Sequence, residues 1–154
     1  MFEGLFQPAH LMVLFLAAVL TLVPGVFYLL TLRKALERCN EEARVASPES
    51  VWLMLIPVFN LVYQFILVGY VAKSLRNELV RRRIAQTDPA PGKSLGIAMS
   101  VLGVGSCMPL PGIVGPLLML LALIFWVLYW MNIADYSGMI ATPFASAEVP
   151  SPTA

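Results

Sequence analysis

The sequence predicts an all-α integral membrane protein, and three observations lead to this fold class. Of the 154 residues, 59% are hydrophobic and only 12% are charged, whereas about a quarter of residues are charged in soluble domains. The apolar residues form four runs of helical length. All ten Lys and Arg residues lie in two stretches, 33–44 and 73–93. Because a charge at the bilayer centre costs roughly 2.5–3.5 kcal/mol, these stretches mark where the chain meets water.

We expect one transmembrane helical domain over residues 1–136 and a flexible tail over residues 137–154, which has too little apolar surface to fold. The expected membrane segments are 10–32, 51–72, 95–110 and 113–134. The first has about 23 residues, enough to cross roughly 30 Å of hydrocarbon. No Lys or Arg precedes it, so we interpret it as an uncleaved helix rather than a signal peptide. Pro24 and Gly25 inside it predict a kink.

Polar, amphipathic segments follow the first two apolar runs. The stretch RKALERCNEEARVA, residues 33–46, predicts a helix that continues into water, because oppositely charged residues stand four apart in it. A serine-proline pair should end this helix. The stretch KSLRNELVRRRI predicts a basic cytoplasmic helix, in which Glu78 and Arg82 have the favourable spacing for an ion pair. The pairs expected in the earlier stretch are Arg33 with Glu37 and Arg38 with Glu42.

The second apolar run allows two topologies. If residues 51–72 span the membrane, the four basic residues of 33–44 and the six of 73–93 fall on opposite sides. If the run is re-entrant and turns near Pro57–Asn60, all ten lie on one side, as the positive-inside tendency favours. Against this, 22 apolar residues are enough to cross, and irregular backbone at depth needs protein cover. We favour re-entry, with the N-terminus outside and the basic segments cytoplasmic in a plasma (inner) membrane.

The third run is rich in small residues. Gly96 and Ser100, and then Gly103 and Cys107, match the small-xxx-small pattern that lets helix backbones approach closely. The pattern favours packing against the fourth run within this chain, and docking onto another subunit is the alternative. Aromatic residues near the run ends are typical of anchors at the headgroup level. These are Trp52, Trp126, Tyr129, Trp130 and Tyr136.

Parts of the sequence resemble two known families of membrane proteins. FYLLTLRKALERCNEEAR, VWLMLIPVFNLVYQFILVGYVAKSLRNE and WVLYWMNIADYSG resemble a family of small bacterial multi-pass membrane proteins of unknown function. The shared pattern is a tryptophan, an IP-x-FN break and a basic S-L-x-x-E helix, here Trp52, residues 56–60 and residues 74–78. The opening MFEGLFQPAHLMVLFLA resembles the first helix of twin-arginine translocase A-type subunits, which implies an outside N-terminus. Their basic hinge is replaced here by apolar VPGVFYLLTL, so their function is not transferred.

The polar residues do not form a recognisable catalytic set. His10 is the only histidine, so no triad or metal site is expected. It is interpreted as an interfacial residue, with axial ligation of a tetrapyrrole as the alternative. Asn60 and Gln64 are four apart, which predicts either hydrogen bonding around the Pro57 break or a ligand or permeation site. No charged residue falls within an apolar run, which weighs against an ion pump.

The basic cluster predicts lipid contact rather than nucleic-acid binding. Arg81, Arg82 and Arg83 beside an amphipathic helix can bind anionic lipid at about 1 kcal/mol per basic residue. Nucleic acid is not expected as a partner of so short a patch.

These observations predict a non-catalytic accessory or structural subunit of a larger membrane complex, of which respiratory and photosynthetic complexes are the examples we favour. It would bind lipids and other membrane subunits, with chlorophyll or carotenoid as optional cofactors. The alternative is a small oligomeric channel or transporter. A lipid-modifying enzyme ranks last because no acid–base pair is present.

Overall fold

The structure, a computed structural model, describes residues 7–85 and 88–141, and its regular elements there are all helical. In chain order they are α1 (Pro8–Arg38), the 3₁₀ helix η2 (Pro48–Leu55), α2 (Pro57–Arg81), α3 (Lys93–Ser106) and α4 (Val114–Ala141). The all-α class is therefore confirmed. Within the described ranges, α1, α2 and α4 are long and apolar enough to cross a membrane, which is compatible with a membrane protein.

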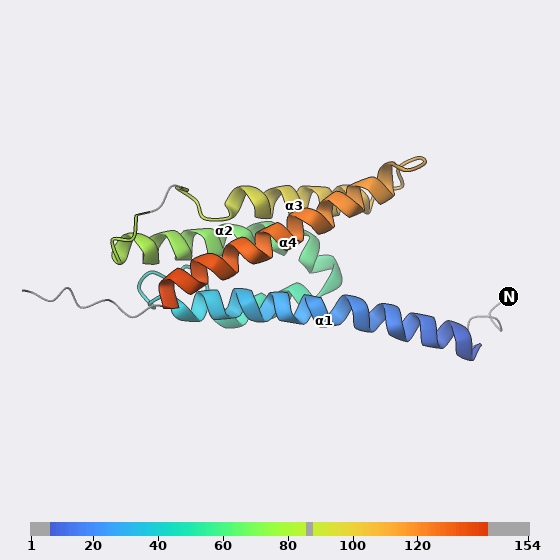
Figure 1. Ribbon diagram of the computed structural model, residues 1–154, viewed down its shortest axis with the longest axis horizontal. Coiled ribbons are helices and arrows are strands. Elements are labelled where there is room, and N and C mark those ends of the chain that lie inside the picture. Colours follow the sequence, from blue (N-terminus) through green and yellow to red (C-terminus); the bar gives the residue numbers. More distant parts are fainter. Residues whose placement is uncertain (1–6, 86–87, 142–154) are drawn as a thin grey trace, which may run out of the picture.

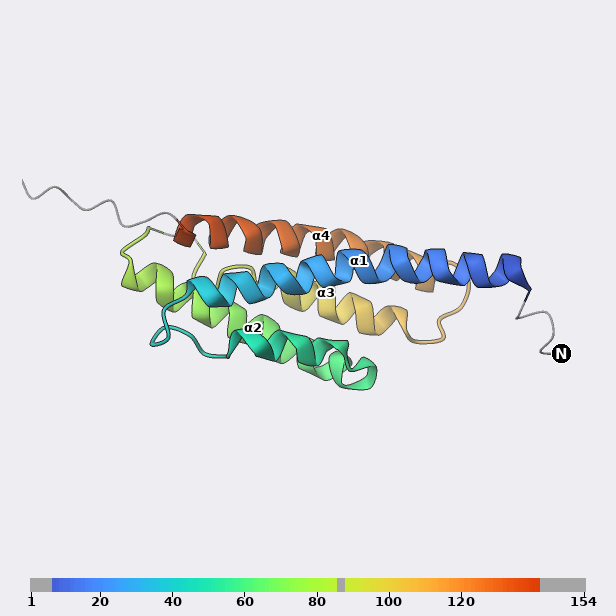
Figure 2. The same cartoon turned by 90° about the horizontal axis from the view of Figure 1, so that it is seen from below.

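The three long helices run in the same direction. Figures 1 and 2 show that α1, α2 and α4 each start toward the end that holds the N-terminus and finish at the opposite end. The shorter η2 and α3 alternate with them along the chain and run in the opposite direction. The basic stretch 33–44 and the described parts of the stretch 73–93 consequently lie toward the same end of the bundle, which we call the basic end.

The break in the second apolar run precedes Pro57. The chain turns at Ile56, which has extended backbone angles, and Pro57 is the first residue of α2. Proline suits this position because its missing N–H would have no partner there and its φ is already helical. Asn60 thus lies in the first turn of α2, not in an irregular break. Figure 2 shows η2 and α2 as the two arms of a hairpin whose turn lies part-way along α1, and η2 packs against both α1 and α2.

The helix expected over residues 33–46 ends early, and that prediction is wrong. Although the Arg33–Glu37 pair forms at 2.9 Å, α1 stops at Arg38. Arg38 does not pair with Glu42. Instead its Nη1 donates to the carbonyl oxygen of Ser137 at 2.8 Å and to the Ser137 hydroxyl at 2.7 Å. This long-range contact with α4 outweighs a local pair worth only a few tenths of a kcal/mol.

The third run forms a short helix. With 14 residues, α3 is about 21 Å long at 1.5 Å per residue, and it is not among the helices of spanning length. It ends at Ser106 rather than residue 110, since the residue before a proline, here Met108, disfavours helical angles. The turn into α4 contains Gly112 at a φ of 61°, a left-handed angle that glycine adopts readily.

The last helix is longer than predicted. The expected tail begins at residue 137, but α4 continues to Ala141, with Ser137 and Ile140 buried. Arg82 bonds the carbonyl oxygen of Ile140, one of the last four carbonyl groups of α4, which lack partners within the helix. Arg38 bonds the carbonyl oxygen of Ser137 just before them. The rest of the expected tail, 142–154, lies outside the described residues.

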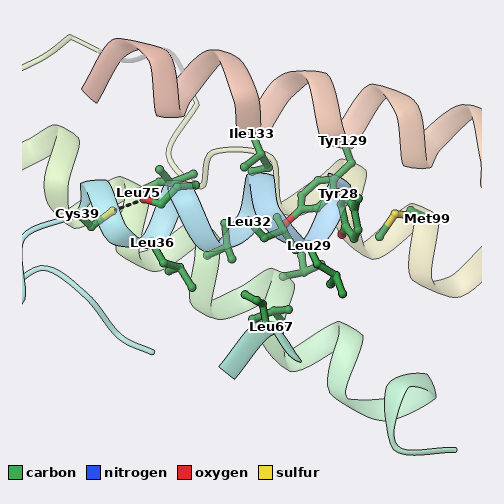
Figure 3. Packing of buried hydrophobic residues seen from close by; sticks show 14 of the residues in the cluster. Tyr28, Leu29, Leu32, Leu36, Cys39, Leu67, Leu75, Met99, Tyr129 and Ile133 are labelled. Carbon is green, nitrogen blue, oxygen red and sulfur yellow. Dashed lines mark hydrogen bonds between the residues drawn. The ribbon is translucent and has the colours of Figure 1, made fainter. Parts of the chain in front are cut away.

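The core is concentrated toward the basic half of the bundle. Figure 3 shows buried side chains of all four α-helices in this core, among them leucines of α1 and α2, Met99 of α3, and Tyr129 and Ile133 of α4. Leu32, Leu36, Leu67 and Leu75 are at most 1% exposed, whereas the side chains of residues 11–16 at the other end of α1 are 48–71% exposed. The N-terminal part of α1 therefore contributes little to the core of this chain.

Candidate functional site

A pocket of about 210 Å³ lies between α1, η2, α2 and α4. Its walls are apolar apart from the two amides of Asn60 and Gln64 and the polar edges of two aromatic rings, and no charged residue lines it. The lining residues are Leu22, Gly25, Val26, Tyr28, Leu29, Met54, Leu55, Asn60, Gln64 and Trp126. A mostly apolar concavity with a few convergent polar groups is the usual form of a small-molecule site.

Among the lining residues, Asn60 has a polar atom without a partner. Its Oδ1 atom is buried and has no hydrogen-bond partner, although buried polar groups are paired in the great majority of cases. Gln64 lies one helical turn further along α2 and lines the same pocket, as the four-residue spacing predicts. α2 presents both amides because its first turn begins directly at Pro57, so that residues 60 and 64 share one helix face.

The α1 wall is opened by Gly25. A Cβ atom built there would meet no atom within 4 Å, so the glycine leaves room in the pocket. The helix runs on through Pro24 and Gly25 from Pro8 to Arg38. The Tyr28 and Trp126 rings, with centroids 5.5 Å apart, form an aromatic wall. Leu22 and Leu55 are 59% and 54% exposed, so the pocket opens onto the apolar outer surface of the bundle.

His10 lies away from this pocket. It is an exposed residue in the first turn of α1, and it does not line the pocket. Among the residues that the structure describes, no group of three His, Cys, Asp or Glu side chains could hold a metal ion.

The two small-residue pairs have different environments. A Cβ at Gly96 would lie 2.5 Å from Val68 Cγ1 and 2.9 Å from Tyr129 Cε2, so Gly96 is where α3 crosses both α2 and α4. Ser100 is buried and donates to the Gly96 carbonyl oxygen at 2.7 Å. Around Gly103 no atom lies within 4 Å of such a Cβ, and Cys107 is exposed. The second pair therefore does not pack within this chain.

The basic cluster is partly engaged inside the protein. Arg81 and Arg82 both bond the carboxylate of Glu78, which is fully buried, whereas Arg83 is exposed with a positive φ of 56°. The spacing of Glu78 and Arg82 signals this pair, but nothing local signals that Glu78 also accepts from the Asn40 backbone N–H at 3.1 Å. Of the three arginines, Arg83 is thus the one that does not bond Glu78.

Comparisons with protein-family models, with curated proteins and with solved structures find no match to this chain.

Proposed function

We propose that the chain is a non-catalytic accessory subunit that packs against other proteins of a larger membrane complex. The observation that supports this proposal most directly is the N-terminal part of α1. Six consecutive side chains, residues 11–16, are 48–71% exposed. Because successive residues of an α-helix are about 100° apart, six in a row point in every direction. This stretch of helix therefore has no side covered by its own chain.

The uncovered stretch has the chemistry of a helix–helix interface in lipid. Residues 11–16 are Leu, Met, Val and Phe, with no charged side chain among them. Helix association in a membrane depends on van der Waals packing and on occasional hydrogen bonds. Such a helix end, projecting past the core that the other helices build (Figure 2), can pack on a neighbouring subunit without disturbing that core.

Extraction in a mild detergent, followed by size analysis and mass spectrometry, tests the proposal. We expect foreign subunits in fixed stoichiometry, and a loss of them in the triple variant Met12→Ala, Phe15→Ala, Leu16→Ala, which trims one face of α1. The matched control is a second triple variant with the same spacing on the exposed surface of α4. It carries Leu120→Ala, Leu123→Ala and Ile124→Ala, and it should retain the foreign subunits.

Two results would contradict the accessory role. One is a particle that contains only copies of this chain. The other is ion flux through liposomes holding the pure protein that disappears in Asn60→Leu, which would favour the alternative of an oligomeric channel or transporter.

We further propose that the bundle lies in a plasma membrane with its N-terminus outside and its basic end in the cytoplasm, so that η2 and α2 form a re-entrant hairpin. This orientation keeps all ten Lys and Arg residues on the cytoplasmic side. The packing of η2 against α1 and α2 supports it, since irregular backbone at membrane depth needs protein cover.

Thiol labelling in intact cells tests this orientation. Cys107 is exposed and directly follows α3, and α3 finishes toward the end of the bundle opposite the basic end (Figure 2). An impermeant maleimide should therefore label it. Cys39 should react only after unfolding, because burial, reinforced by the nearby Glu78 carboxylate, raises the pKa of its thiol to about 12 and the thiolate is the reactive form.

Two single-cysteine variants, Val45→Cys and Ala90→Cys, in a chain without Cys39 and Cys107, complete the test. Both should be labelled only after the membrane is permeabilised. Labelling of the two from opposite sides would exclude the re-entrant hairpin.

A further inference from the structure

We propose that a pocket between α1 and α4, at the basic end of the bundle, binds the phosphate of an anionic phospholipid. This α1–α4 pocket measures about 280 Å³, and the two helices lie side by side there (Figures 1 and 2). Phe27, Leu30, Lys34 and Arg38 of α1 line it opposite Ala134 and Ser137 of α4. The inference goes beyond the accessory role, because it concerns a lipid on this chain and requires no partner subunit.

Two cationic side chains line the α1–α4 pocket, and no carboxylate does. Lys34 is exposed and forms no ion pair with any residue that the structure describes. Arg38 is partly buried, and its two hydrogen bonds both use Nη1 and go to the uncharged carbonyl and hydroxyl oxygens of Ser137. Within the described ranges, neither positive charge is neutralised by an ion pair. An anion between them would therefore be stabilised.

The other polar pocket at the basic end has mixed charge. Four arginines line it, but so do three glutamates from residues 37–42, and their carboxylates would repel an anion. Two of these arginines, Arg81 and Arg82, already bond the buried Glu78 carboxylate. Of the two pockets, the α1–α4 pocket thus has the charge that suits a phosphate.

The lining of the α1–α4 pocket changes from apolar to cationic along α1. Phe27 and Leu30 are 58% and 41% exposed and belong to the apolar run 10–32. Lys34 and Arg38 lie about 3 and 9 Å beyond the end of this run at 1.5 Å per residue, whereas the headgroup layer of a bilayer is about 5–8 Å thick. Since helical side chains tilt toward the N-terminus, Arg38 reaches back toward this layer. A lipid therefore fits with its phosphate beside the two cations and its chain against Phe27 and Leu30.

The occupant that matches this lining is a phospholipid with a net negative charge. Basic pockets between transmembrane helices bind such headgroups, and a guanidinium matches phosphate oxygens while an ammonium binds them as a point charge. A soluble phosphate ester would use the two cations but leave Phe27 and Leu30 uncovered. Phosphatidylcholine would bring a cation of its own close to Lys34 and Arg38. Phosphatidylglycerol should therefore bind more tightly than phosphatidylcholine.

Native mass spectrometry of the purified full chain in a nonionic detergent tests this inference. The probes are dioleoyl phosphatidylglycerol and dioleoyl phosphatidylcholine, and the measured quantity is the dissociation constant of the first bound lipid. Two cations at about 1 kcal/mol each should favour phosphatidylglycerol about 30-fold. Lys34→Gln should weaken phosphatidylglycerol binding about fivefold, the factor for one such residue, whereas Lys34→Arg should retain it.

Lys73→Gln is the matched control for charge. Lys73 is also exposed, follows an apolar run and forms no ion pair within the described ranges, but it does not line the α1–α4 pocket. Ala134→Phe fills the pocket without removing a charge. Because Ala134 is exposed, this variant should fold and lose the preference for phosphatidylglycerol. Ala18→Phe, at an exposed alanine of α1 outside the pocket, should keep the preference.

Three results would overturn the proposal. Equal losses in Lys34→Gln and Lys73→Gln would indicate attraction to the whole basic end rather than to this pocket. Displacement of the lipid by an equal concentration of glycerol 3-phosphate would make the ligand a soluble phosphate. Binding of oleate as tight as that of phosphatidylglycerol would show that the site does not require a phosphate. None of these results affects the co-purification test, which detects foreign subunits rather than lipids.

Discussion

Replacing Glu78 with glutamine is expected to lower the free energy of unfolding by about 3 kcal/mol. The Glu78 side chain is 0% exposed, and four donors bond its carboxylate. Oε1 accepts from Arg82 Nε at 2.6 Å and from Arg81 Nη2 at 2.8 Å. Oε2 accepts from Arg81 Nε and from the Asn40 backbone N–H, both at 3.1 Å. An amide in this place would turn its own N–H groups toward guanidinium donors and leave their charge uncompensated.

The exposure of the arginine partners of Glu78 determines how much free energy of unfolding is lost. Removing one member of a buried ion pair costs about 3–5 kcal/mol, and the lower figure applies because the Arg81 side chain is 41% exposed and can be hydrated. Titration of the purified protein with sodium dodecyl sulfate in mixed micelles measures the change. Glu49→Gln is the matched control. The Glu49 side chain is 65% exposed beside Arg33, so its loss should cost at most about 1 kcal/mol. Equal costs for the two variants would contradict this account.

The same network holds three helices together at the basic end. Arg82 bonds Glu78 within α2 and donates through Nη1 to the Ile140 carbonyl oxygen at 2.7 Å. Arg38 of α1 reaches Ser137 one turn earlier on α4. Arg38 at the end of α1 and Arg82 directly after α2 thus both bond carbonyl groups near the end of α4. The sequence suggests surface arginines, but these contacts make Arg38 and Arg82 part of the tertiary structure.

The spacing of residues in the sequence predicted contacts between residues that are close in the chain. The Arg33–Glu37 and Glu78–Arg82 pairs formed because i,i+4 neighbours always share a helix face. The contact of Arg38 with Ser137 joins residues 99 apart in the chain, and no periodicity reports such a pairing. For this reason both the early end of α1 and the extension of α4 were missed.

The sequence predicted one wall of the candidate site but not the other. The shared face of Asn60 and Gln64 follows from their spacing, but the opposite wall comes from α1 and η2, whose arrangement depends on the whole bundle. The aromatic residues show the same limit. Their positions near the run ends predict headgroup anchors, yet the Trp126 and Trp130 rings both pack around Tyr28. Trp130 also donates from Nε1 to Thr31 Oγ1 at 2.8 Å, which ties α4 to α1.

Gly96→Ala is expected to lower the free energy of unfolding by about 1–3 kcal/mol, the usual cost of overpacking a filled interior. The added Cβ would lie 2.5 and 2.8 Å from the two Cγ atoms of Val68 and 2.9 Å from Tyr129 Cε2. Val68 is β-branched and 1% exposed, and Tyr129 is also 1% exposed, so neither side chain can turn aside. To relieve the overlap, α3 would have to move away from α2 and α4.

Gly103→Ala provides the matched control within the same helix. No atom lies within 4 Å of a Cβ at residue 103, so this substitution should leave stability unchanged or raise it by up to about 1 kcal/mol, since alanine favours a helix over glycine. The same denaturant titration compares the two variants. If both raised stability alike, Gly96 would be replaceable, and the close crossing of α3 over α2 and α4 would not depend on it. Opposite signs for two glycines in one helix would show that the crossing point, rather than helix propensity, requires glycine at residue 96.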